Sequence, residues 1–379
     1  NTRLKHDAEA ELDLLHPGTQ IETKNIRFTS YNALLRENTF TTLCTFLQES
    51  PTNILVLDEC HMLRNGSMTA KQVQRLVEHV PHTCILYSSA TAASCTNHLQ
   101  YMNRMQLWGE GTPFATHTDL SDALKKHGAS LMELLSIQMR ASGSYLSRQL
   151  SFSNIVMENV FINLNATERR VYNRCVQMLR ENDYVSGTGP QAFYQKLITG
   201  IKTRHAIELT RTCLKKGHSV IISLVNTGEA YMRRDLKAND HTRSSHYRVG
   251  EDLLERFGED FDDIPINPID HILEELGHDN VAELTGRSVV LKRSNDGQIV
   301  TSAKAKIIDE TQKFQDGTKK VAILSKAGGV GISLHDHTHG QKRSHIILEM
   351  PWSAEDFMQQ LGRSHRSNCI TSPEYFLLV

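Results

Sequence analysis

The sequence predicts an α/β protein with two domains, each built on a parallel sheet flanked by helices. Short apolar runs recur along the chain, and each ends in a polar or glycine-rich cluster that is followed by a helical pattern. Near-continuous apolar runs of this kind are typical of strands buried on both faces of a sheet. The chain has 379 residues, which is more than one ordinary core needs and enough for two domains.

The predicted strands form two groups, one before about residue 114 and one after about residue 216. They are the runs at 53–57, 84–87, 219–224, 321–324, 345–348 and, at the end of the chain, 376–379. Alternation of such strands with helical patterns indicates an α/β architecture. Between the two groups, helical periodicity over 131–150 and 167–179 predicts a helical connection.

We expect a first domain over residues 1–159, ending in a helical tail, and a second domain over residues 160–379. An insertion is predicted at about 232–300 in the second domain, because its first part is polar and ends in an acidic run. Within this range, Pro268 suits the first turn of a helix over 268–276 whose apolar residues share one face.

The charge balance and the cysteines exclude several classes of protein. Net charge is −1, from 42 Lys and Arg against 43 Asp and Glu, so a polyanion would have to be held by local patches. The seven cysteines form no C-x-x-C pair, which indicates reduced thiols in an intracellular protein rather than a disulfide framework or a zinc site. No apolar run approaches the roughly 18 residues of a membrane-spanning helix, so we expect no membrane partner.

The strand predicted at 53–57 leads into Asp58-Glu59-Cys60-His61. Ligands of α/β sheets gather at the carboxyl ends of strands. Asp58 is therefore a candidate ligand of Mg²⁺, a hard cation that prefers carboxylate oxygen. Glu59 is a candidate for orienting or deprotonating an attacking water, and His61 completes the D-E-x-H pattern beside Asp58 as a binding residue. The alternative is a strand end capped by solvated acids.

The next predicted strand, at 84–87, leads into Ser88 and the triplet Ser89-Ala90-Thr91. Small hydroxylated residues at a strand end can hydrogen-bond the neighbouring acids and move with the state of a phosphate. We therefore expect this triplet to couple the acids to conformational change. The alternative is an ordinary turn, where Ser and Thr are routine.

A glycine-rich turn, Ser325-Lys326-Ala327-Gly328-Gly329-Val330-Gly331, follows the strand predicted at 321–324. Glycine lets backbone amides approach phosphate oxygens closely, whether these belong to a nucleotide or to a nucleic-acid strand. Gly329 and Gly331 are therefore candidate phosphate-binding positions.

The segment Gln359-Gln360-Leu361-Gly362-Arg363-Ser364-His365-Arg366 carries the strongest signal. Ser353 suits an N-cap ahead of it, so a helix is predicted. Arg363 and Arg366 are three apart and would share a helical face, where two guanidiniums can clamp a γ-phosphoryl group as its charge develops. Gln359 and Gly362 belong to the same candidate site. The alternative is a solvated, basic helix end.

These segments stand in the order of superfamily 2 helicase motifs II, III, V and VI, and within that superfamily the sequence most resembles the strawberry notch family. The blocks that carry this resemblance span nearly the whole chain, at 101–104, 107–114, 148–152, 226–230, 281–287, 351–354 and 362–368. The resemblance implies two RecA-like domains that bind ATP and Mg²⁺ in the cleft between them and act as a helicase or translocase.

The resemblance also implies contacts with the sugar-phosphate backbone of a nucleic acid. Thr29 and Tyr31 stand where this superfamily contacts that backbone, and Thr227 and Ser325 are candidate contacts in the second domain. The alternatives are a strand that ends in hydroxyl residues at 29–31 and a capped helix start at 227.

Two segments, 58–65 and 326–331, resemble those of the Swi/Snf-type duplex-DNA translocases, whereas the triplet at 89–91 does not. On the strength of the two segments, DNA is favoured over RNA as the substrate. The alternatives are an RNA helicase and a motor-fold transcriptional regulator with transcription or chromatin partners and little ATPase activity. Such a protein is expected in the nucleus of a eukaryote and in the cytoplasm otherwise.

No G-x-x-x-x-G-K-[ST] sequence occurs in the chain. In similar proteins this loop cradles the β- and γ-phosphates and precedes the position of Asn1. We expect the loop upstream of Asn1. We also expect the 379 residues alone to hydrolyse ATP poorly, because they lack the amides and the lysine that the loop would supply.

Overall fold

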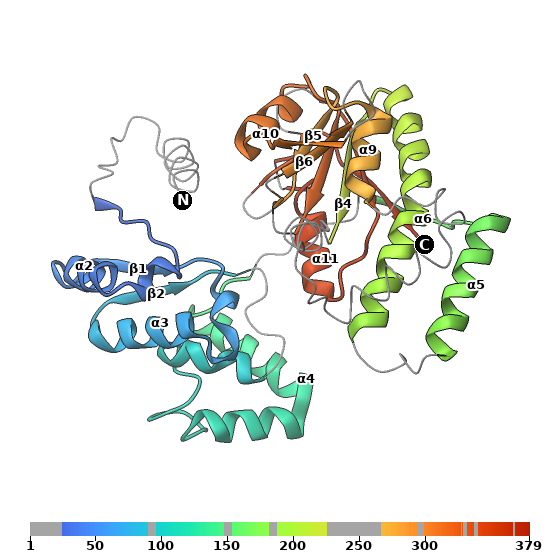
Figure 1. Cartoon of the computed structure of the whole chain (residues 1–379). Coiled ribbons are helices and arrows are strands. Elements are labelled where there is room, and N and C mark those ends of the chain that lie inside the picture. Colours follow the sequence, from blue (N-terminus) through green and yellow to red (C-terminus); the bar gives the residue numbers. More distant parts are fainter. Residues whose placement is uncertain are drawn as a thin grey trace, which may run out of the picture. The chain divides into compact units, whose positions relative to one another are not determined.

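The computed structural model divides the chain into two compact units, Asn1–Gln149 and Leu150–Val379 (Figure 1). The residues that it describes are 25–89, 96–147, 154–181, 188–225, 267–287, 289–293, 299–326, 328, 332–336, 340–366 and 368–379. Each unit contains parallel strands flanked by helices, which confirms the predicted α/β class.

The first unit is built around two parallel strands, β1 (Ile54–Leu57) and β2 (Cys84–Tyr87). Both lie where the apolar runs predict them. The other elements of this unit are, in chain order, η2 (Ala33–Leu35), α2 (Glu37–Gln48), η3 (Cys60–Gly66), α3 (Met68–His79), η4 (Thr96–Met105) and α4 (His117–Ala141).

Within the described residues, only one face of this strand pair is covered. Leu55 and Leu57 are buried against apolar residues of α2 and α3. On the other face, Ile54 is 60% exposed, Val56 55% and Leu86 56%. The run at 53–57 predicts a strand buried on both faces, whereas β1 alternates because both helices pack on the side of Leu55 and Leu57.

The second unit contains a six-stranded parallel sheet in the order β3-β10-β9-β4-β8-β5. Its strands are, in that order, Val156–Val160, Glu374–Leu378, Arg343–Ile347, Ser219–Leu224, Val321–Ser325 and Val281–Leu284. Because β3 pairs with β10, this strand belongs to the second unit. The chain divides after Gln149 in the structure, ten residues before the boundary that we expected after residue 159.

Helices cover both faces of this sheet. The described helices of this unit are α5 (Ala166–Glu181), α6 (Thr188–Lys215), α9 (Pro268–Leu276), α10 (Ile307–Gln315) and α11 (Ala354–Leu361). Val220 and Ile222 of β4 pack with apolar residues of α6 and α9, whereas Ile221 packs with Phe314 of α10. Every residue of β4 is buried, as its continuous apolar run predicts.

Part of the range predicted as an insertion belongs to the core of this unit. The helix α9 spans Pro268–Leu276 as predicted, with the Asn267 side chain as its N-cap acceptor and Pro268 in its first turn. The strand β5 follows and pairs with β8 at the edge of the sheet. The strands β6 (Val289–Arg293) and β7 (Ile299–Ala303) form a separate antiparallel pair. Residues 226–266 lie outside the described part of the chain.

A buried ion cluster joins α9 to the turn after β5. The Arg287 side chain is 0% exposed and donates Nε and Nη2 to the two carboxylate oxygens of Glu283, at 2.6 and 2.9 Å. Its Nη1 donates to Asp270 Oδ1 at 2.6 Å, and Lys304 Nζ lies 3.7 Å from Glu283. Two cations therefore face two carboxylates, and each guanidinium edge is used.

The sequence predicts no membrane-spanning helix and reduced cysteines. In the part of the chain that it describes, no helix is both long enough and apolar enough to cross a membrane. The cysteines in that part are free thiols, and they are Cys44, Cys60, Cys84, Cys175, Cys213 and Cys369.

The ion cluster makes a testable prediction about stability. Arg287→Leu should lower the free energy of unfolding by about 3–5 kcal/mol, because it removes the cation that pairs with Asp270 and leaves Glu283 with Lys304 alone. The control is Arg211→Ala, which removes a pair with Glu275 whose side chains are 48% and 44% exposed and should cost at most about 1 kcal/mol. Urea unfolding measures both, and equal losses would contradict the prediction.

Candidate functional site

The first set of candidate residues follows β1. Asp58 and Glu59 leave the carboxyl end of the strand, and both are exposed to solvent. Two backbone hydrogen bonds join this segment to the end of β2, from Ser88 N to Leu57 O at 3.0 Å and from Cys60 N to Ser88 O at 2.9 Å. The acids and the serines after β2 are thereby held side by side, as expected for the ends of two neighbouring parallel strands.

Glu59 has a strained backbone. Its φ is 48° and its ψ is 44°, in the left-handed region that glycine adopts readily and that other residues enter at a cost. The next residue, Cys60, is fully buried and begins η3. A strained non-glycine residue that persists at a strand end is a mark of functional sites, where surrounding contacts impose the conformation.

His61 connects the acids to the serine triplet. Its Nδ1 lies 3.1 Å from Glu59 Oε2 and 3.1 Å from Ser89 Oγ. Both contacts converge on this one ring nitrogen. The orientation of Glu59 is therefore set by a side chain that also touches the first residue of the triplet.

Asp58 is held by hydroxyl groups on both its side chain and its backbone. Ser88 Oγ donates to Asp58 Oδ1 at 3.1 Å, and the Tyr31 hydroxyl donates to the Asp58 carbonyl at 2.7 Å. Burial raises the pKa of Tyr31, so this phenol stays protonated. Tyr31, predicted to contact nucleic acid, thus has its hydroxyl proton directed at the acidic segment, whereas Thr29 is exposed.

The donor set at Asp58 fits a magnesium ion bound with a nucleotide. The exposed carboxylate is a hard oxygen ligand, and Mg²⁺ usually takes one or two carboxylates together with waters and substrate phosphates. No group of three or more His, Cys, Asp or Glu side chains arranged for a metal occurs among the described residues. Asp58 would therefore hold Mg²⁺ as a single carboxylate ligand, and water and phosphate oxygens would supply most of the other ligands.

In the second unit, Ser325 ends β8 and is 1% exposed. Its Oγ accepts from Gly286 N at 3.3 Å and from Gly328 N at 3.2 Å. The hydroxyl of this predicted nucleic-acid contact therefore links the glycine turn to the segment after β5.

Gly328 sits against the backbone of that segment. A Cβ atom on Gly328 would lie 2.3 Å from Leu284 O and 2.6 Å from Thr285 C, which are backbone atoms that cannot move aside as a side chain can. Glycine is required here by close approach of two chain segments.

The arginine segment differs from its prediction in one respect. Ser353 caps α11 as expected, accepting from Asp356 N at 3.0 Å, but α11 ends at Leu361. Beyond Gly362 the amides of Arg363 and Ser364 donate to carbonyls three residues back, so the chain forms a turn. The prediction that Arg363 and Arg366 share a helical face is therefore wrong. We call residues 362–366 the arginine turn.

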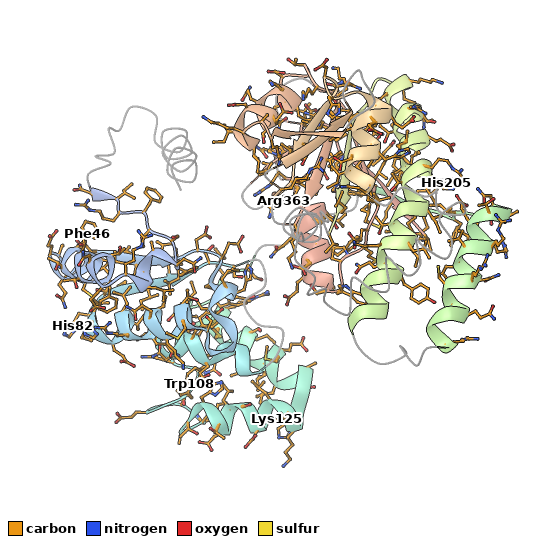
Figure 2. All side chains as sticks on the ribbon, in the orientation of Figure 1. Phe46, His82, Trp108, Lys125, His205 and Arg363 are labelled. Atoms are coloured by element: carbon orange, nitrogen blue, oxygen red, sulfur yellow. The ribbon has the colours of Figure 1, made fainter. Side chains whose placement is uncertain are left out.

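The two arginines differ in exposure. Arg363, labelled in Figure 2, is half-buried, and its Nη1 donates to Ile332 O at 3.4 Å. Arg366 is exposed, and its backbone amide donates to Cys369 Sγ at 3.1 Å. Gln359 is half-buried on α11. The turn thus presents one guanidinium fixed beside the chain that follows the glycine turn and one open to solvent.

Five of the predicted site residues lie outside the described part of the chain, namely Ala90, Thr91, Thr227, Gly329 and Gly331. Conversely, sequence reasoning missed an ion pair between Lys326 Nζ and Asp356 Oδ2 at 2.7 Å, which joins the glycine turn to the first turn of α11. The sequence signals for this pair were a lysine in the glycine turn, Lys326, and an acid shortly before the arginine segment, Asp356.

Two protein-family models match the chain. The one described as P-loop containing NTP hydrolase pore-1 matches residues 8–174, and the one described as C-terminal domain on Strawberry notch homologue matches residues 267–379. The first match contains β1, β2 and the acids that follow β1. The second contains α9, the glycine turn and the arginine turn.

Curated relatives agree with these matches. Protein strawberry notch homolog 2 of Mus musculus is 27% identical over 99% of this chain, and protein strawberry notch homolog 1 of Rattus norvegicus is 26% identical over 86%. The chain spans only 40% and 38% of these relatives' own lengths.

Among solved structures, the DUF1998 helicase MrfA bound to DNA and AMPPNP is 13% identical, with a TM-score of 0.46 over 100% of this chain and 40% of that chain. By the two family models and the relatives that match most of its length, the chain is a strawberry notch-like helicase-family protein, with regions similar to a P-loop NTPase domain and to a helicase C-terminal domain.

Proposed function

We propose that this chain provides the motor region of an ATP-dependent nucleic-acid translocase that acts on DNA in preference to RNA. The observation that carries the proposal is the arrangement after β1. There a strained, exposed glutamate is oriented by His61, and the neighbouring Asp58 is held by Ser88. Family membership adds the expectation of nucleotide chemistry at this strand end.

The acids supply the hydrolytic half of the proposal. Asp58 holds Mg²⁺, whose charge offsets that of the phosphates, and Glu59 orients the attacking water or takes its proton. The contact from His61 Nδ1, 3.1 Å from Glu59 Oε2, orients the Glu59 carboxylate. Ser89, which touches the same ring nitrogen, then senses any movement of the acids.

The arginine turn supplies the transition-state half. A guanidinium stabilises the charge that develops on a transferring phosphoryl group, and its planar fork matches phosphate oxygens. We assign this role to Arg363 and Arg366, with Gln359 beside them. The Gly329 and Gly331 amides are assigned to phosphate binding, and Thr29, Tyr31 and Thr227 to the nucleic-acid backbone. Ser325, which is 1% exposed and accepts from two backbone amides, is assigned to holding the glycine turn instead.

Glu59→Gln in the full-length protein should keep ATP binding and lose most of the turnover, since the amide cannot accept a proton from water. Glu78→Gln, an exposed carboxylate on α3, is the matched control and should behave as the wild type. The assay is ATP turnover at saturating nucleic acid together with nucleotide affinity. Wild-type turnover in Glu59→Gln would refute the assignment.

Arg366→Ala in the full-length protein should cost far more in turnover than in ATP affinity, because such arginines are typically worth about 10³–10⁵ in rate. Arg363→Lys should also fail, since an ammonium lacks the planar fork. If these arginines instead grip nucleic acid alone, turnover will recover at saturating DNA or RNA and binding will become weaker and less salt-dependent. The deciding measurement is ATPase rate against nucleic-acid concentration.

The preference for DNA is tested by the polymer that stimulates turnover. Duplex DNA should raise the ATPase rate of the full-length protein at lower concentration than single-stranded or duplex RNA of matched length, with all affinities compared at one salt concentration. Stimulation by RNA alone would identify an RNA helicase. If the protein binds nucleotide but no polymer stimulates its ATPase activity, the result would favour the alternative of a motor-fold transcriptional regulator.

A further inference from the structure

A chain of buried polar groups crosses the second unit beneath the arginine turn. His345 of β9 lies at its centre, with Nε2 2.9 Å from Ser223 Oγ of β4 and Nδ1 2.8 Å from Ser364 Oγ. Ser364 Oγ is also 3.1 Å from the Tyr375 hydroxyl of β10 and 3.2 Å from Leu361 O. These four side chains, Ser223, His345, Ser364 and Tyr375, are the histidine relay.

One arrangement of protons satisfies every member of the relay. The Tyr375 hydroxyl donates to Leu361 O at 2.9 Å, so it accepts from Ser364. Ser364 then accepts from His345 Nδ1–H, and His345 Nε2 accepts from the Ser223 hydroxyl. In this arrangement the imidazole is neutral with its proton on Nδ1.

Burial keeps the ring neutral. His345, Ser223, Ser364 and Tyr375 are all 0% exposed, and burial lowers the pKa of His345 to about 3. The ring therefore neither gains nor loses a proton near neutral pH, and acid–base chemistry is not its task. Its Nδ1 contacts Ser364 of the arginine turn, and its Nε2 contacts Ser223 of β4.

The far end of the relay fixes the backbone around Arg363. Ser364 follows Arg363 directly, and its hydroxyl is held by His345 and Tyr375. On the other side, the Arg363 carbonyl accepts from Leu334 N at 2.7 Å. Leu334 itself is 0% exposed in the core beside α10. Arg363 is thus clamped between two buried anchors while its guanidinium remains half-buried.

We propose that His345 is a positioning residue that holds the arginine turn, through Ser364, in the geometry that Arg363 needs for phosphoryl transfer. This inference rests on the proposed function. Through Ser364, His345 and Tyr375 tie the turn to β9 and β10, whereas Ser223 contacts the opposite nitrogen of the ring. An apolar residue at 345 would fill the same space and leave two hydroxyls without their partner.

The test compares two hydroxyl deletions of equal size on opposite nitrogens of one ring. Ser364→Ala in the full-length protein should lower kcat by about 10- to 100-fold, as a displacement of about 1 Å at a reacting group does, with little change in the KM for ATP. Ser223→Ala should cost similar stability, measured by thermal unfolding, and much less turnover. Equal losses of turnover at equal stability would overturn the inference.

A double-mutant cycle separates this inference from the proposed function. If Arg363→Ala is already inactive, adding Ser364→Ala should remove nothing further, because the relay acts through Arg363. A low rate in Arg363→Ala with a normal rate in Ser364→Ala refutes the positioning role alone. A normal rate in Arg363→Ala refutes the proposed role of that arginine and the positioning role with it.

Hydrogen–deuterium exchange provides a readout that does not need activity. His345→Phe and Ser364→Ala should both speed exchange of the amides at 362–366, while Ser223→Ala should leave them protected. Unchanged exchange in His345→Phe would overturn the inference even if turnover fell, since the turn would then be held without the relay.

Discussion

The structure of the second unit depends on one constraint, which is that its parallel sheet is covered by helices on both faces. Every backbone group of a strand such as β4 is used in pairing with its neighbours, and no polar side chain can reach solvent from the strand interior. Functional groups are therefore confined to the strand ends and to the turns that follow. Ser325, at the end of β8, lies in such a place.

The same constraint determines how polar groups inside the unit must behave. Arg287 and Glu283 are kept together as a balanced ion cluster, because removing either charge from its partner would leave the other buried. His345 is kept neutral, because its ring nitrogens contact the hydroxyls of Ser223 and Ser364, which cannot compensate a buried charge as a carboxylate would. Both clusters link elements that are distant in sequence.

Much of this architecture could be predicted from local pattern. The bounds of α9 follow from a proline, a capping asparagine and an apolar face, all within ten residues of sequence. The proximity of Asp58 and Ser88 follows from the rule that parallel strand ends share an edge. The end of α11 could not be predicted, because the residues just beyond it bond to groups far away in the sequence. The Ser364 hydroxyl contacts His345 of β9, and the Arg363 carbonyl accepts from Leu334 N. The left-handed backbone of Glu59 could not be predicted either, since glutamate has no intrinsic preference for it.

That backbone has a consequence for how the protein would change under different selection. A glutamate held at φ 48° stores conformational energy that glycine or asparagine at the same position would release. If Glu59 has the hydrolytic role proposed above, stability and activity are opposed at this one residue. A lineage that kept the fold for binding but abandoned hydrolysis would be expected to lose Glu59 early, and to gain thermal stability as it did so.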